Sequence, residues 1–237
     1  MASTLTRLLW PARCAACAAV SDETEAFCPA CSEEVLPLEN ACVGCALPRD
    51  SAGALCGACR SRPFPFQRAR AAFVYGGAVA DAIVRFKHGR HLGRARLLGG
   101  YLVPLLDWAL EHRVTRILPV PLHPRRLRQR GFNQSLELLR AADRLRRRAG
   151  QRSSLPFDAD ALVRKRDTPP LGHLPPLGRR HRVADAFAVR DAKKVVRQRI
   201  LLVDDVMTTG ATLAECAETL LRAGAAEVWV AALARAV

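Results

Sequence analysis

Two adjacent aspartates followed by threonines and a glycine carry the most specific chemistry of this 237-residue chain, in the stretch Ile200 to Leu213, ILLVDDVMTTGATL. The apolar run before the aspartates is typical of a strand buried on both faces of a parallel sheet, and such sheets bind ligands beyond the carboxyl ends of their strands. Residues Thr208 to Thr212 predict a turn into a helix, with free N–H groups and hydroxyls at the positive end of the helix dipole. The stretch therefore predicts a phosphate-binding loop.

The carboxylates of Asp204 and Asp205 suit another part of the same ligand. A carboxylate does not hold a phosphate, but it accepts hydrogen bonds from vicinal sugar hydroxyls a few ångströms away. Sugar and phosphate together indicate a ribose 5-phosphate unit. The alternative is an Asp-rich turn that caps a helix, but a cap requires one Asp rather than the whole run. The stretch also lacks the Gly-Lys-Ser or Gly-Lys-Thr of a nucleotide P-loop.

Four CxxC pairs in the first quarter of the chain predict a metal module. A CxxC turn directs two thiolates at one point, and a tetrahedral Zn²⁺ needs two such turns, so eight sulfurs predict two structural zinc sites. Successive pairs would give two zinc ribbons in series, which we favour, whereas alternating pairs would give a cross-brace. The eight expected ligands are Cys14, Cys17, Cys28, Cys31, Cys42, Cys45, Cys56 and Cys59.

Disulfides are the alternative use of these cysteines. Neighbouring CxxC thiols form strained bridges, and the N-terminus, with one Arg inside a short apolar patch, is a poor signal peptide. We therefore expect zinc and a cytoplasmic location. The module has little else to fold around, so chelation is expected to unfold residues 10–62 and to spare the rest.

The charge is strongly positive, with 37 Lys and Arg against 22 Asp and Glu and a formal net charge of +15. A field of this sign favours polyanions such as nucleic acid or phosphorylated small molecules, or anionic membranes, although a GC-rich genome would give the same arginine bias. Half of the residues are hydrophobic, which fits a globular protein rather than a disordered one. The apolar runs are short and interrupted, so no membrane span is expected.

The elements that must position these residues follow from periodicity and turn residues. Pro63 and Pro65 mark a boundary where the cysteines stop, so we expect a zinc module at 1–62 and an α/β domain at 63–237. The last forty residues read as strand, loop, helix, turn and strand, with Cys216 on the apolar helix face as a core residue. Between them we expect a strand at 68–77, helices at 78–89 and roughly 94–111, a strand at 116–122, a long basic loop at 123–134, a helix at 135–150 and a Pro- and Arg-rich loop at 162–187.

The stretch from Leu202 to Thr212 resembles the PRPP-binding motif of type I phosphoribosyltransferases. The resemblance implies that Asp204 and Asp205 hold the ribose 2′- and 3′-hydroxyls, that the following turn holds the 5-phosphate, and that Mg²⁺ accompanies PRPP. The implied PRPP-binding residues are Asp204, Asp205, Val206, Met207, Thr208, Thr209, Gly210, Ala211 and Thr212.

A wider resemblance covers nearly the whole chain. The four CxxC pairs, the segment PVPLHPRRLRQRGFNQS (Pro119 to Ser135), the region from Arg164 to Thr168 and the terminal motif together are similar to the ComF family. This implies a type I phosphoribosyltransferase-like parallel sheet flanked by helices, preceded by a small Cys-rich zinc-ribbon module. The family pattern differs at Leu171, where it has Gln, and at Arg182, where it has Asn.

The same resemblance assigns two further sets of residues, while the catalytic residue stays unassigned. The middle motif implies a pyrophosphate-side loop, and the Pro- and Arg-rich loop implies a mobile flap over the substrate. The expected pyrophosphate or polyanion contacts from this motif are Arg125, Arg126, Arg128, Arg130, Gly131, Asn133 and Gln134. Lys87, in the separate segment RFKHGR, is a further expected contact, with a solvated helix-end lysine as the alternative. The expected flap residues are Arg164, Arg166, Thr168 and Arg179.

Two functions from different classes follow. ComF relatives are associated with the uptake of single-stranded DNA in natural transformation, which implies DNA and a competence helicase or processing protein as partners. The alternative is an active phosphoribosyltransferase of nucleotide metabolism, which transfers the ribosyl group of PRPP to a nitrogen nucleophile and has no DNA role. A third hypothesis is a catalytically silent PRPP sensor that switches DNA affinity. Few aromatic residues lie near the basic regions, which argues against a base-stacking platform.

Overall fold

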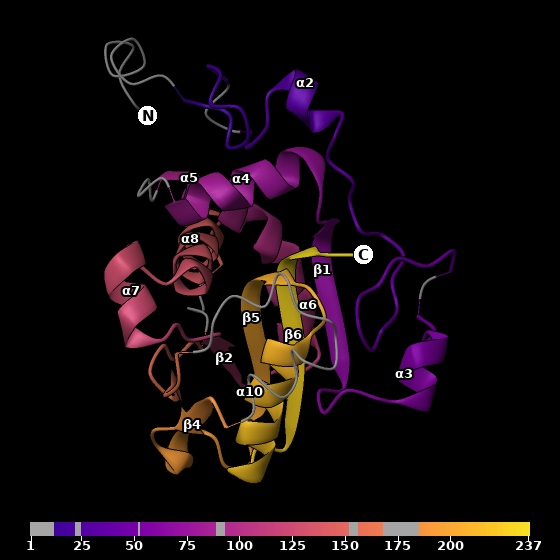
Figure 1. Cartoon of the computed structure of the whole chain (residues 1–237), viewed down its shortest axis with the longest axis vertical. Coiled ribbons are helices and arrows are strands. Elements are labelled where there is room, and N and C mark those ends of the chain that lie inside the picture. The colour runs from indigo at the N-terminus through magenta and orange to yellow at the C-terminus, as the bar shows by residue number, and fades with distance from the viewer. Residues whose placement is uncertain (1–11, 22–24, 52, 89–92, 152–155, 168–184) are drawn as a thin grey trace.

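Figure 1 shows the computed structural model of the chain, which describes residues 12–21, 25–51, 53–88, 93–151, 156–167 and 185–237. Its centre is a four-stranded parallel sheet in the order β1-β6-β5-β2. The two central strands, β5 and β6, are buried along almost their whole length, which confirms the parallel sheet that the apolar runs predict. The strands are β1 (Arg68–Val74), β2 (Arg116–Pro119), β5 (Arg199–Met207) and β6 (Glu227–Arg235).

Helices cover both faces of the sheet. Alternate residues of β5 point to opposite sides, and since they are apolar on both sides, each face needs a covering layer. Leu201 and Val203 pack into one core, and Ile200 and Leu202 pack into the other. Cys216 is fully buried in the second core, as its helical spacing predicts. The first layer contains α4 (Gly77–His88), α5 (Gly93–Gly99), the 3-10 helix η1 (Gly100–Leu102), α6 (Val103–Glu111) and α8 (Gln134–Arg148), and the second contains α10 (Ala211–Arg222).

The helix expected over roughly 94–111 is interrupted. It ends as α5 at Gly99, continues as one 3-10 turn and resumes as α6, which has a proline in its first turn. A Cβ on Gly99 would lie 2.7 Å from Ala141 Cβ and 3.0 Å from the Leu138 carbonyl oxygen. The glycine therefore allows α5 to approach α8 closely, and weak helix propensity at the two adjacent glycines permits the break.

Two expected loops contain regular structure. The basic segment 123–134 was expected to be a loop, which is wrong, because it contains α7 (Pro124–Arg130). His123 caps this helix by accepting the Arg125 N–H at 3.3 Å, and Gly131 ends it with a φ of 87°. The expected loop 162–187 begins and ends in a short antiparallel pair, β3 (Leu162–Arg164) and β4 (Phe187–Val189).

The zinc module lies against the sheet and contributes to both cores. Cys14 and Cys28 are buried in the core of α4 and α5, whereas Cys42, Cys45 and Cys59 are buried in the core of α10. The connection between the two groups follows β1, where Leu38 donates to the Ala72 carbonyl and Ala69 to the Val43 carbonyl, so the free edge of β1 is covered. The module contains α2 (Pro29–Ser32) and α3 (Gly57–Ser61), visible beside α4 and β1 in Figure 1.

Within the described part of the chain, no helix has both the length and the apolar character needed to cross a membrane.

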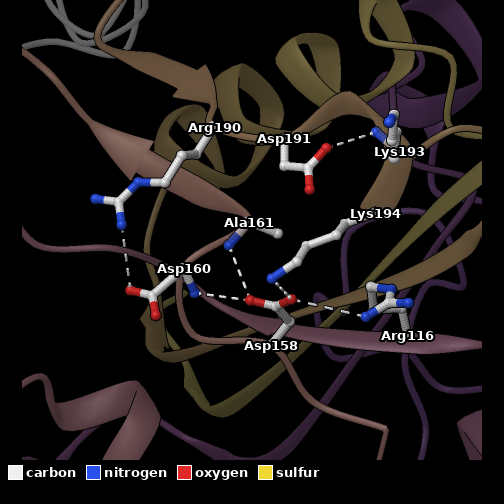
Figure 2. Close-up of polar contacts among 8 residues, drawn as sticks. All are labelled: Arg116, Asp158, Asp160, Ala161, Arg190, Asp191, Lys193 and Lys194. Carbon is white, nitrogen blue, oxygen red and sulfur yellow. Dashed lines mark hydrogen bonds and ion pairs between the residues drawn. The ribbon is translucent and has the colours of Figure 1, made fainter.

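A polar cluster around Asp158 fixes the base of the β3–β4 pair (Figure 2). The Asp158 carboxylate accepts the backbone N–H groups of Asp160 at 2.9 Å and Ala161 at 3.0 Å. It also pairs with Lys194 at 2.8 Å and with Arg116 at 3.7 Å, which joins this turn to β2 and to the segment before β5. Burial raises the pKa of Asp158, but Lys194 and the backbone donors outweigh it and lower the pKa below the ordinary value.

The Asp158→Asn variant is expected to lower the free energy of unfolding by up to about 1 kcal/mol at pH 7, because the two partly exposed cations lose their shared acceptor. Since the folded pKa is depressed, this contribution is present above the unfolded value of 3.8 and is lost as the pH falls through the folded value. Urea unfolding at pH 7 and below pH 4 measures both effects. The matched control is Asp160→Asn, because that side chain is 74% exposed and pairs with Arg190 at 3.9 Å. Equal stability of the Asp158 variant and the wild type at pH 7 would contradict the assignment.

Candidate functional site

The eight paired cysteines form two groups of four, each made from successive CxxC pairs. Within each group all four sulfur atoms lie within 4.8 Å of one another. The Sγ atoms of Cys17 and Cys28 are 3.7 Å apart, as are those of Cys45 and Cys56. A tetrahedral Zn²⁺ with Zn–S bonds of about 2.3 Å has sulfur–sulfur edges of about 3.8 Å, so the residues fit zinc. This confirms two Cys₄ sites and the serial pairing.

Backbone N–H groups prepare these sites for thiolates. Cys28 N donates to Cys14 Sγ at 3.4 Å, and Cys56 N donates to Cys42 Sγ at 3.2 Å. Burial raises the pKa of both acceptor thiols, but the backbone donors outweigh it and lower the pKa of Cys14 to about 6 and of Cys42 to about 7. Burial and neighbouring cysteines raise the pKa of Cys59 far above its ordinary value, because four thiolates cannot share one point without a cation.

The two aspartates lie within β5, which continues through them to Met207. Asp204 is 9% exposed and Asp205 is 3% exposed. Asp204 Oδ1 accepts hydrogen bonds from Ser135 Oγ at 3.0 Å and from the Asp205 N–H at 2.9 Å. Lys87, at the end of α4, places Nζ 2.5 Å from Asp205 Oδ2 in an ion pair. Three elements distant in sequence therefore meet at this carboxylate pair.

The two carboxylates have opposite electrostatic environments. Burial and the neighbouring Asp205 raise the pKa of Asp204 to about 7. Burial also raises the pKa of Asp205, but Lys87 outweighs it, and the net pKa lies below the ordinary value. Asp205 is therefore the ionised member of the pair, and Asp204 titrates near neutral pH.

The turn after β5 has an open polar end. Gly210, with a φ of 76°, is the N-cap of α10 and offers no side chain to cap its N–H groups. The buried Thr209 Oγ1 has no hydrogen-bond partner among the described residues. A buried hydroxyl without a partner costs about 1–3 kcal/mol, which an acceptor oxygen from a ligand would recover. Together with the α10 dipole, this arrangement suits a phosphate.

Among the basic residues expected to contact an anion, Lys87 and Arg130 face the aspartates. Arg130 Nη1 donates to Gln134 Oε1 at 2.6 Å. Burial lowers the pKa of Arg130, while the charge of Asp205 raises it, which places the guanidinium near the carboxylates. Asn133 has a structural position, because its Oδ1 caps α8 at the Ser135 N–H and its Nδ2 donates to the Val120 carbonyl.

The other expected contacts are paired elsewhere, exposed, or outside the described residues. Arg125 and Arg126 pair with Asp167 at 3.6 Å and 3.5 Å, and Arg128 is exposed. In the expected flap, Arg164 is 8% exposed and lies over the Phe187 ring at 5.4 Å, whereas Arg166 is exposed. The flap residues Thr168 and Arg179, and the divergent positions Leu171 and Arg182, lie outside the described residues.

Sequence reasoning alone does not identify two buried residues that contact the site, Ser135 and Arg235. Ser135 lies in the first turn of α8, which follows β2 and α7, and β2 is the neighbour of β5. Arg235 ends β6 in register with Met207, so its side chain reaches the carbonyls of Met207 and Thr208. For Arg235 the available signal was a polar residue at the carboxyl end of an adjacent parallel strand, which becomes informative once the strand order is known.

A cavity of about 390 Å³ lies beside the turn between α7 and α8. Its wall is mostly apolar, with a buried arginine and two ion pairs, a mixture common in small-molecule sites. The pairs are Arg140 with Glu137 at 2.7 Å and Arg190 with Asp160 at 3.9 Å. The lining includes Pro121, Leu122, Leu127, Phe132, Asn133, Leu136, Leu162 and Arg164.

Comparison with known domain families agrees with this organisation. The double zinc ribbon domain matches residues 5–64, and the phosphoribosyl transferase domain matches residues 139–236. Among solved structures, a purine phosphoribosyltransferase from Pyrococcus horikoshii overlaps 60% of this chain and 70% of its own, with 21% identity and a TM-score of 0.32. The fold assignment rests on the sheet topology and the matched domains.

Two curated relatives extend the similarity. The DNA utilization protein YhgH of Escherichia coli K12 is 34% identical over 176 residues, which cover 72% of this chain and 73% of the relative. Competence protein F of Haemophilus influenzae is 35% identical over 121 residues, and the match spans about half of each protein. With its double zinc ribbon, its phosphoribosyl transferase domain and these relatives, the chain belongs to the ComF family.

Proposed function

We propose that the chain binds PRPP, or a related ribose 5-phosphate ligand, and acts in the handling of single-stranded DNA. The observation that carries this proposal is the carboxylate pair of Asp204 and Asp205 followed directly by the open N-terminus of α10. Between them lies the Thr209 hydroxyl, which has no hydrogen-bond partner within the described part of the chain. The carboxylates suit the ribose hydroxyls, and residues 208–212 suit the 5-phosphate.

Lys87 and Arg130 suit the pyrophosphate end of the ligand. Lys87 reaches Asp205 from α4 and remains 24% exposed, so its ammonium can donate to an incoming phosphate while it stays paired with the carboxylate. Mg²⁺ bound with PRPP would neutralise further charge on the pyrophosphate. Arg125 and Arg126 are already paired with Asp167, so we expect them to contribute less than Lys87 and Arg130 to binding of the anion.

The DNA role is supported by what the relatives are called and by the charge of the chain. One relative is named for DNA utilization and another for competence. The formal net charge is +15, and arginines line α7 and the last turn of α8. DNA held through several phosphates should weaken steeply as salt rises, whereas a small ligand in a helix-terminus site should weaken far less. A competence helicase or processing protein is the partner class that this role implies.

The cavity beside α7 favours a second candidate, an active phosphoribosyltransferase. A volume of about 390 Å³ with mostly apolar walls is large enough for an aromatic nitrogen base as the acceptor. In that reaction the acceptor nitrogen bonds to ribose C1 as the C1–O bond to pyrophosphate breaks. The pyrophosphate leaves with the bonding electrons, and the nitrogen releases its proton to water. Release of pyrophosphate only when a base is added would support this candidate over binding alone.

Titration of PRPP with Mg²⁺ into the zinc-loaded chain is expected to raise its thermal stability, by about 2.7 kcal/mol near 100 times Kd. The Asp204→Asn, Asp205→Asn double variant should show no response, because an amide at both positions removes the charged acceptors for the ribose hydroxyls. Differential scanning fluorimetry measures both proteins, and single-stranded DNA is titrated in parallel across salt concentrations. If neither protein responds to PRPP while DNA still binds, the ribose-phosphate proposal is wrong and the DNA proposal stands alone.

A further inference from the structure

The zinc module touches the proposed phosphate loop through one buried arginine. Arg235, the last residue of β6, is 5% exposed. Its Nε donates to the Cys45 carbonyl at 2.7 Å, and its Nη1 donates to the Met207 carbonyl at 3.1 Å. Nη1 also contacts the carbonyls of Thr208 and Ala236. One planar guanidinium therefore joins the third CxxC turn, Cys42 to Cys45, to the end of β5 and the start of the loop.

An aromatic contact reinforces this connection. Phe64 follows the second zinc group and stacks on Phe66, with ring centroids 4.7 Å apart, and Phe66 is buried in the same core as Cys42 and Cys45. A Cβ on Gly210 would lie 2.9 Å from Phe64 Cε1 and 3.0 Å from Met207 Cε. The loop glycine is therefore enclosed by the segment that leaves the second metal site.

The first metal site has a different environment. Cys14 and Cys28 pack in the core of the opposite face of the sheet, with Phe73 and the helices α4 and α5. Phe27, between the pairs of this site, contacts Phe73 and Tyr101. The two sites have the same four-cysteine chemistry, but the second connects to the loop through Arg235, whereas the first packs on the opposite face of the sheet. The first site is therefore a control for the second.

We infer that the Cys₄ site of Cys42, Cys45, Cys56 and Cys59 holds the loop of residues 208–211 in its phosphate-receiving shape, with Arg235 as the positioning residue between them. Arg235 donates to the carbonyls of Met207 and Thr208, which restrains the two peptide units at the start of the loop. When zinc leaves this site, the Cys45 carbonyl loses its fixed position and the arginine loses its anchor. The loop then samples more conformations, and a phosphate ligand must order it on binding. The ligand consequence rests on the proposed function, but the effect on the loop does not.

Hydrogen–deuterium exchange of the full-length, zinc-loaded chain tests the connection, read on peptides that cover residues 204–213. Cys42→Ser and Cys14→Ser are matched variants, since each thiol is fully buried and accepts the N–H of its site's third cysteine. Exchange of the 208–211 amides should become at least about tenfold faster in Cys42→Ser and stay near the wild-type rate in Cys14→Ser. Equal effects of the two variants would overturn the inference.

Arg235 variants keep the test decisive if a cysteine variant fails to fold. Arg235→Met, with both zinc ions retained by elemental analysis, should speed loop exchange, and Arg235→Lys should restore part of the protection. Arg146→Met is the control, because Arg146 is also 5% exposed but pairs with Asp107. Wild-type exchange in Arg235→Met would refute the role of Arg235. In parallel, PRPP–Mg²⁺ affinity should fall about tenfold in Arg235→Met but not in Arg146→Met. If the loop responds but the wild type binds no PRPP, the connection holds and the proposed ligand is wrong.

Discussion

Removal of zinc from both Cys₄ sites is expected to unfold the whole chain, rather than residues 10–62 alone. The sequence suggests an independent module, but the structure places Cys14 and Cys28 in one core of the sheet and Cys42, Cys45 and Cys59 in the other. The chain between them also covers the edge of β1. Loss of the metal therefore weakens both faces of the sheet at once.

The magnitudes favour a global effect. Structural zinc contributes about 10–16 kcal/mol of apparent binding free energy in small peptides, whereas a whole domain is stable by only about 5–15 kcal/mol. A fraction of the zinc-binding free energy of the two sites is therefore as large as the free energy of unfolding of a whole domain. A chelator in excess should lower Tm by at least about 15 °C or abolish the cooperative transition, as followed by circular dichroism.

Chelator saturated with zinc beforehand is the control, and added zinc should restore the transition. If residues 63–237 keep their helical signal and a cooperative transition after both ions are removed, the shared cores do not matter for stability. The boundary near residue 62 would then also be a boundary of folding.

The metal sites and the central strand could be predicted from sequence because their signals are local. The CxxC pairs recur at fixed intervals, and this spacing suffices to place two turns around one ion. The run from Ile200 to Val203 is short and wholly apolar, and the turn that follows it contains the small residues that a helix start requires. The helix α7 was also predictable in principle, since His123, Pro124 and Gly131 are cap, first-turn and terminating residues, but its many arginines suggested a loop.

The partners of the site residues could not be predicted, because they depend on the strand order. Ser135 and Asp204 are 69 positions apart, and Arg235 and Cys45 are 190 apart. Lys87 was expected near an anion, yet nothing in the sequence of α4 indicates that its ammonium would pair with Asp205. Such contacts form only when β1, β6, β5 and β2 align their carboxyl ends at one edge.

The Lys87→Met variant is expected to lose about 3–5 kcal/mol of stability at pH 7, because it leaves a buried carboxylate without its cation. Asp205 is 3% exposed, and methionine keeps most of the volume of lysine, so the loss measures charge rather than packing. The neighbouring Arg130 also interacts with the charge of Asp205, so it replaces part of the lost attraction. The replacement is incomplete, because Arg130 is only partly buried and already donates to Gln134. Lys194→Met is a control, since Lys194 is also a lysine in an ion pair but lies at the Asp158 cluster.

The pH dependence of Lys87→Met should separate the loss of this charge from general damage. In the wild type, Asp205 has a lowered folded pKa, so its contribution is present above the unfolded value of 3.8 and is lost on acidification. The contribution of Asp204 to stability changes with pH in the opposite direction, because its folded pKa of about 7 lies above the unfolded value of 3.8. Burial of Asp204 therefore lowers the free energy of unfolding as the pH rises toward 7. Without Lys87 both carboxylates resist ionisation, and the variant should gain stability relative to wild type as the pH falls from 8 to 5. Urea unfolding across this range measures the difference, and a pH-independent gap between the two proteins would show that Lys87 acts through packing and not through the charge of Asp205.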